Sequence, residues 1–136
     1  MEVKFDVHGL PPKKDGANSM WRKGTELPRL KALRVAALEA LGGAPMLTQN
    51  AELLISIYAD SRSGDLDNFI SGICDGLMKA HPNTPIDDRA WLDVPPEAHP
   101  RKSIAFSDDP IVRKIVAERK PQDRADAWYE IAISGE

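Results

Sequence analysis

The positions of apolar side chains predict two strands and two helices in the N-terminal part of the chain. Residues 2–8 alternate between apolar and polar side chains, which is the pattern of a half-buried strand. Over residues 27–41 the apolar positions recur every three or four residues, which predicts an amphipathic helix that ends at Gly42–Gly43. Residues 52–59 have the pattern of a second strand, and residues 66–80 return to helical spacing.

The segment that follows is rich in proline. Residues 81–107 contain Pro82, Pro85, Pro95, Pro96 and Pro100, and we interpret them as a long loop inserted in the domain. Loops of this length are uncommon within a domain and are often functional. Trp91 in this loop is therefore the tryptophan that we expect to be available for binding, whereas Trp128 is expected in the core.

The pattern after Asp108–Asp109 admits two interpretations. One is a helix that begins at Pro110, and the other is a single helical turn near 110–113 followed by a strand over 114–119. We prefer the strand because residues 127–133 alternate as a final strand, and the seven residues between the two suit a hairpin connection.

The resulting order of elements, β-α-β-α-β-β, predicts the fold class. It indicates an α+β fold, in which a small mixed sheet packs against two helices in two layers. A chain of 136 residues suits a single domain with its own core, so we assign residues 1–136 to one domain.

Composition narrows the class of protein. The single cysteine, Cys74, excludes an internal disulfide framework, and its apolar neighbours predict that it is buried. No apolar run is long enough to cross a membrane and the N-terminus lacks a secretion-signal pattern, so we expect a cytoplasmic protein with no membrane partner. The net charge of −3 argues against a broad basic surface, although carboxylates gathered in one site would hide a basic rim from that sum.

The run DLDN at 65–68 carries the most informative chemistry. Asp65 and Asp67 stand two residues apart where a strand turns into a helix, and carboxylates are preferred ligands of Mg²⁺. Such a pair is weak evidence alone, because acidic residues also cap many helices. Asp108–Asp109 supplies further carboxylates at another element boundary, and Asp87–Asp88 is a rival pair.

Four motifs follow one another in the order found in a known nuclease family. They are VHGLPPKKDGANSMW at 7–21, DLDN at 65–68, DDPIVRKIVAERK at 108–120 and AWYEIAI at 127–133. In this order the chain resembles the RusA-type Holliday-junction resolvases over nearly its whole length. The resemblance implies a homodimeric, Mg²⁺-dependent DNA endonuclease, with Mn²⁺ as an alternative cofactor, that resolves four-way junctions in recombination and repair.

The resemblance also assigns roles to carboxylates. Asp65, Asp67 and Asp109 match the catalytic, metal-binding aspartates of the family, and Asp108 is a further metal ligand. We prefer Asp108–Asp109 to the rival pair because the spacing to the following strand fits the family pattern. We therefore expect Asp65, Asp67 and Asp109 to converge around one metal ion, with oxygens about 4–6 Å apart.

One departure from the family pattern concerns positive charge. The family has a functionally important lysine six residues after the first aspartate, where this chain has Ser71. Lys79 and Lys114 are the candidates to replace that lysine. The candidates for contact with DNA are basic or amide side chains spread along the chain: Lys13, Lys14, Asn18, Arg22, Lys23, Arg62, Asn68, Lys114 and Lys120.

Two alternative functions stay open at this point. Ser71 and the acidic net charge favour a junction- or DNA-binding protein of the same fold whose catalysis is weakened. The other alternative is a metal-stabilised domain without a role on DNA.

Overall fold

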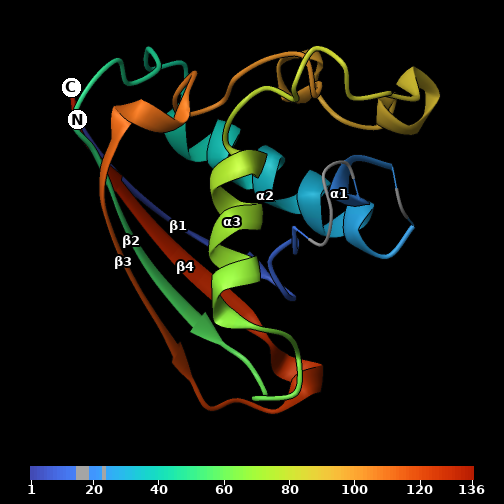
Figure 1. Cartoon of the computed structure of the whole chain (residues 1–136), viewed down its shortest axis with the longest axis vertical. Coiled ribbons are helices and arrows are strands. Elements are labelled where there is room, and N and C mark those ends of the chain that lie inside the picture. Colours follow the sequence, from blue (N-terminus) through green and yellow to red (C-terminus); the bar gives the residue numbers. More distant parts are fainter. Residues whose placement is uncertain (15–18, 23) are drawn as a thin grey trace.

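The computed structural model describes residues 1–14, 19–22 and 24–136, which form an α+β fold with a four-stranded mixed sheet and three α-helices. The strands are β1 (Glu2–His8), β2 (Ala51–Tyr58), β3 (Val112–Lys120) and β4 (Trp128–Ser134), and the helices are α1 (Ser19–Arg22), α2 (Glu26–Leu41) and α3 (Leu66–Gly76). Figure 1 shows α3 running alongside the sheet and α2 packed next to it. The α+β class with a mixed sheet is therefore confirmed.

The two faces of the sheet differ because apolar residues alternate along its strands. On β2, Leu53 and Ile57 are fully buried under the helices, whereas Leu54 is 52% exposed on the opposite face. The same alternation buries Tyr129 and Ile133 of β4. The helices thus cover one face of the sheet, and the core lies between the two layers.

The order of the strands corrects one prediction. The sheet runs β1-β4-β2-β3, with β4 antiparallel to both neighbours and β3 parallel to β2. The expected hairpin between the last two strands is therefore wrong, because β2 lies between them. The pattern of side chains explains the order: β4 has apolar residues that need burial, whereas β3 carries charges such as Lys114 and Glu118, which protect an exposed edge.

Most predicted elements occur, with two differences. The strand interpretation after Asp109 is confirmed, since a 3₁₀ turn at Asp109–Ile111 leads into β3. The short helix α1 was missed within a segment rich in Pro, Gly and Asn, so the described part of the chain has three α-helices rather than two. Helix α3 ends at Gly76, earlier than expected. Cys74 is buried as predicted, and burial raises the pKa of its thiol to about 12.

The proline-rich segment 81–107 is held against the domain by an arginine. Arg34 on α2 is fully buried, and its guanidinium donates hydrogen bonds to five backbone carbonyls. The acceptors are the carbonyls of Gly76, Met78, Ala98, His99 and Lys102. Burial lowers the pKa of Arg34 to about 9, and the five carbonyls stabilise its charge, so the side chain stays protonated at neutral pH. Trp91 in this segment is only 4% exposed, so its expected availability for binding is wrong.

The N-terminal segment crosses α3 at a glycine. The backbone N–H of Lys14 donates to the carbonyl of Asn68, and a Cβ atom on Gly72 would lie 1.9 Å from the carbonyl oxygen of Pro12. No side chain fits in that space, so Gly72 permits the close approach. The crossing fixes Lys13 and Lys14 on the surface of α3.

Candidate functional site

Asp65 and Asp67 lie at the first turn of α3. Asp65 is the N-cap residue in an extended conformation, and Asp67 lies in the first turn. Both side chains are exposed. The positive end of the helix dipole favours carboxylates here, which is a structural reason for their position in addition to any chemistry.

Asp108 and Asp109 lie at the other end of α3. They line a cleft of about 570 Å³, which we call the acidic cleft, together with Asp75, Lys14 and Lys79. Asp108 accepts a hydrogen bond from the backbone N–H of Asp109 at 2.8 Å, which fixes the turn that leads into β3. This end of the helix therefore gathers three carboxylates and two ammonium groups.

The structure does not bring Asp65 and Asp67 together with Asp109 within one chain. Asp65 precedes α3 and Asp75 lies in its last turn, so the two are about 15 Å apart at 1.5 Å per residue. Figure 1 likewise shows α3 beginning near the lower end of the sheet, while the turn before β3 lies at the upper end of the sheet. Among the described residues, no three Asp, Glu, His or Cys side chains are placed to hold a metal ion. The expected convergence is wrong for a single chain.

The exposed face of α3 joins the two acidic groups. Asp67, Ser71 and Asp75 are spaced four residues apart, so they lie in a row along one face of the helix. Ser71 is exposed, on the same face as Asp67, as expected. Asp75 was missed as a candidate, although its spacing from Asp67 was the signal that could have found it.

Lys14 supplies positive charge inside the acidic cleft. Its ammonium lies 2.9 Å from a carboxylate oxygen of Asp75. The hydrogen bond and charge of Asp75 raise the pKa of Lys14, and the charge of Asp109 raises it further. Lys14 therefore binds carboxylates in the free protein rather than standing open for DNA. Of the two candidates to replace the family lysine, Lys79 lines this cleft.

Lys114, the other candidate, lies on the far side of the sheet. It pairs in register with Glu52 and so shares the face opposite the helices. Lys120 lies on that face too, with its ammonium 3.4 Å from the hydroxyl of Tyr58. Tyr58 stacks on Trp128 at a centroid distance of 4.1 Å, so Trp128 is half-buried on the open face rather than in the core.

The remaining DNA-contact candidates are divided among several places. Arg22 is exposed on α1, and Asn68 lies on α3 with its carbonyl bound to Lys14. Asn18 and Lys23 lie outside the described residues. Lys13 and Arg62 line a second cleft at the start of α3.

Comparison with known proteins adds no assignment. Neither the family models nor the curated proteins that were searched match this chain. The resemblance to RusA-type resolvases therefore depends on the motifs of the chain itself. Within the part of the chain that the structure describes, none of the helices has the length and apolar character needed to cross a membrane.

Proposed function

We propose that the protein is a metal-dependent, structure-selective DNA endonuclease of the RusA type, and that two copies together complete each active site. One observation carries this proposal: two carboxylate groups lie at opposite ends of the exposed face of α3. Neither group alone contains all three of Asp65, Asp67 and Asp109, the carboxylates that the motifs predict for the site.

A twofold axis that relates two copies of the chain across α3 would bring the two carboxylate groups together. Two copies of α3 would then run antiparallel, so that Asp65 and Asp67 of one copy face Asp108 and Asp109 of the other. Because a twofold interface is self-complementary, it creates two identical sites. Two sites related by a twofold axis match the two symmetric strands that must be cut in a four-way junction.

The chemistry of the donors fits a hard cation. Four carboxylates from two copies would suit Mg²⁺ or Mn²⁺, which prefer oxygen ligands. A divalent cation bound there would lower the pKa of a bound water and offset charge on the scissile phosphate. Without a cation the facing carboxylates repel one another, so we expect Mg²⁺ to promote dimerisation, which light scattering with and without EDTA would measure.

Mixing two inactive variants tests whether the site is shared. Asp67→Asn and Asp109→Asn should each abolish cleavage of a synthetic four-way junction. In a mixed dimer of the two variants, one site has both substitutions and the other has neither. The mixture should therefore recover nicking activity at about a quarter of the wild-type sites, if subunits exchange at random.

An inactive mixture, in spite of mixed dimers shown by native mass spectrometry, would contradict a shared site. Wild-type protein that binds junctions but never cuts them with Mg²⁺ or Mn²⁺ would favour the alternative, a junction-binding protein with weakened catalysis. Ser71 and the engagement of Lys14 with Asp75 are the observations that favour this alternative.

A further inference from the structure

The second cleft is basic, although the protein as a whole is acidic. It is an open cleft of about 860 Å³ between the end of β1, the start of α2, the residues before α3 and the residues before β4. Its charged lining residues are Lys13, Arg29, Arg62, Arg124, Glu26 and Asp126. Four cations thus face two carboxylates in a chain with a net charge of −3. We call this site the basic cleft.

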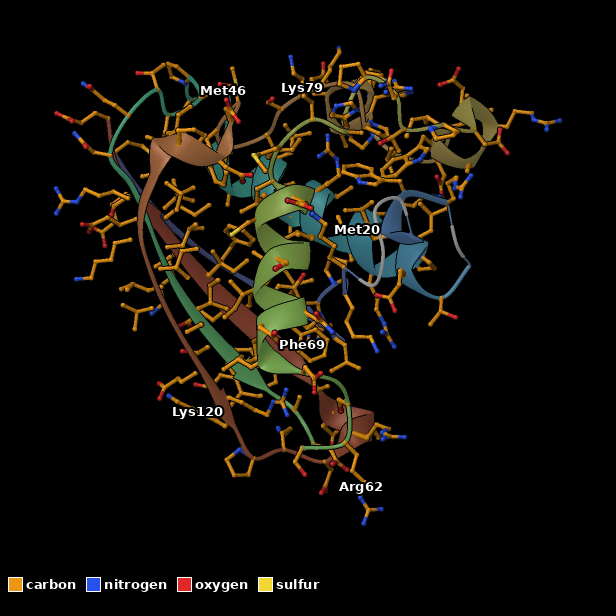
Figure 2. All side chains as sticks on the ribbon, in the orientation of Figure 1. Met20, Met46, Arg62, Phe69, Lys79 and Lys120 are labelled. Atoms are coloured by element: carbon orange, nitrogen blue, oxygen red, sulfur yellow. The ribbon has the colours of Figure 1, made fainter. Side chains whose placement is uncertain are left out.

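Three of the four cations have no acceptor among the residues that the structure describes. Arg29 is paired with Glu26 at 3.1 Å, and Glu26 also accepts the backbone N–H of Lys13 at 2.7 Å. The side chains of Lys13, Arg62 and Arg124, by contrast, form no hydrogen bond or ion pair with any residue that the structure describes. Figure 2 shows Arg62 projecting outward beyond the start of α3. These cations are available to a ligand with several negative charges.

The same lining also contains a buried hydroxyl group, that of Ser63. Ser63 is 9% exposed, and its Oγ atom has no hydrogen-bond partner among the described residues. Buried polar groups are nearly always paired, so this hydroxyl beside the cleft would gain a partner if a rotation of its side chain brought the Oγ atom to a bound phosphate. Ser63 follows Arg62 directly, so one short segment presents both groups.

We infer that the basic cleft binds the phosphate backbone of a nucleic-acid strand. Separated cations along an open cleft fit a ligand that carries a phosphate at each repeat, and arginine is well suited to phosphate oxygens because it donates two parallel hydrogen bonds. The choice of a nucleic-acid strand over a free nucleotide rests on the proposed function.

The position of the cleft relates it to the carboxylates at the start of α3. Arg62 and Asp65 are three residues apart, so their Cα atoms are at most about 11 Å apart. A strand held by Arg62 would therefore pass close to Asp65 and Asp67. The basic cleft would position the strand, and the shared acidic site would cut it.

Strand binding in EDTA tests the inference without any cleavage. The probe is a fluorescein-labelled single-stranded oligonucleotide, measured by anisotropy with the full-length protein. The double variant Arg62→Gln/Arg124→Gln should bind about 100-fold more weakly, at about tenfold for each lost contact to a charged group. Its slope of log affinity against log salt should fall by about 1.4, at 0.7 for each single-strand phosphate contact.

The matched control is Arg89→Gln/Arg113→Gln, which removes the same charge from exposed arginines that do not line the cleft. The control should bind as the wild type does, and thermal melts should show that both double variants are folded. Equal losses in the two double variants, or no strand binding by the wild type, would overturn the inference. Binding of deoxynucleoside monophosphate as tight as that of the oligonucleotide would also overturn it, in favour of a single-nucleotide site.

The outcome for the basic cleft is separable from that for the nuclease. Strand binding that depends on Arg62 and Arg124, with no cleavage in Mg²⁺ or Mn²⁺, would support the cleft and contradict the nuclease. Cleavage that is equally strong in the cleft variant and its control would support the nuclease and contradict a role for the basic cleft.

Discussion

The two clefts lie at opposite ends of α3. They differ in charge and in whether their lysine ammonium groups are paired with carboxylates. Figure 2 shows Arg62 beyond the start of the helix and Lys79 beyond its end. In the acidic cleft Lys14 is bound to Asp75, whereas in the basic cleft the ammonium of Lys13 has no acceptor within the described part of the chain. Neighbouring lysines therefore belong to different sites, because the crossing at Gly72 lies between the two clefts. A net charge close to zero can thus conceal a separation of charge across one molecule.

The largest expected difference between the clefts concerns cleavage. Asp67→Asn should abolish cutting of a four-way junction while leaving strand binding in the basic cleft intact or stronger, because a negative charge near phosphate is removed. Gel assays of cleavage in Mg²⁺ and of binding in EDTA measure the two effects separately. Parallel loss of both would mean that Asp67 is needed for strand binding as well as for cutting.

The stability of the wall of the acidic cleft should depend on Arg34 more strongly than that of the basic cleft. Arg34→Leu would remove the donor shared by five carbonyls, two of them at Gly76 and Met78 beside the acidic cleft. We expect a loss of about 3–5 kcal/mol in the free energy of unfolding, measured by urea denaturation.

The control is Lys31→Leu on the same helix, where the ammonium pairs with the exposed Asp93 at 2.9 Å. Exposed ion pairs contribute little, so this variant should lose no more than about 1 kcal/mol. Similar losses for the two variants would show that the buried guanidinium has no special part in holding the segment 81–107.

Neighbouring substitutions on the crossing segment should have opposite effects. Lys13→Gln should weaken strand binding about tenfold, because it removes a phosphate contact. Lys14→Gln should instead raise the affinity of the acidic cleft for Mg²⁺ about fivefold, since it removes a competing charge beside Asp75. Calorimetric titration with Mg²⁺ and anisotropy with DNA would measure both affinities for both variants. The same change of DNA affinity and of Mg²⁺ affinity in the two variants would indicate that the two clefts act as one site.

The pair of Lys14 and Asp75 also has a defined pH dependence. The pKa of Lys14 in the folded protein is raised above 10.5. Its stabilising contribution is therefore complete below pH 10.5 and is lost as the pH rises past the raised pKa. Lys14→Gln should remove this alkaline part of the stability profile, which urea denaturation at a series of alkaline pH values would measure.

The smallest expected effect belongs to Ser63. Its hydroxyl has no partner in residues 1–14, 19–22 and 24–136, so Ser63→Ala should leave the melting temperature unchanged or slightly higher. Strand binding should weaken about two- to tenfold, the range for one neutral hydrogen bond. Ser61→Ala, two residues earlier and outside the basic cleft, is the matched control. An equal loss of strand affinity in that variant would show that the Ser63 hydroxyl does not contact the strand.

Sequence patterns predicted the elements better than their arrangement. Alternation located β1, β2 and β4 because it reflects which side of a strand is buried, a local property. The neighbours of β4 were not predictable in this way, since strand order depends on how completely each strand needs burial. Asp65 and Asp109 were expected together from the order of the motifs, but that order contains no information on distance. In the structure the length of α3 separates the two residues.

Arg34 gives the clearest example of a residue whose role was hidden. Its position on the buried face of α2 follows from helical spacing, but a charged residue is rarely assigned to a core. The five carbonyls that satisfy it come from segments elsewhere in the chain. Only the folded structure brings them together.

The same arginine has a consequence for the order of events in folding. The nearest of its five acceptors is 42 residues away in the sequence and the farthest is 68 residues away. Contacts between such distant residues require the closure of long loops, whose entropy cost precedes any gain from the bond. Helix α2 forms from local hydrogen bonds and needs no such closure, but the segment of residues 98–102 cannot be secured until the guanidinium reaches it. The backbone N–H of Ala80 in the wall of the acidic cleft donates to the carbonyl of Pro100 in this segment, so this wall should become ordered after the start of α2 that borders the basic cleft.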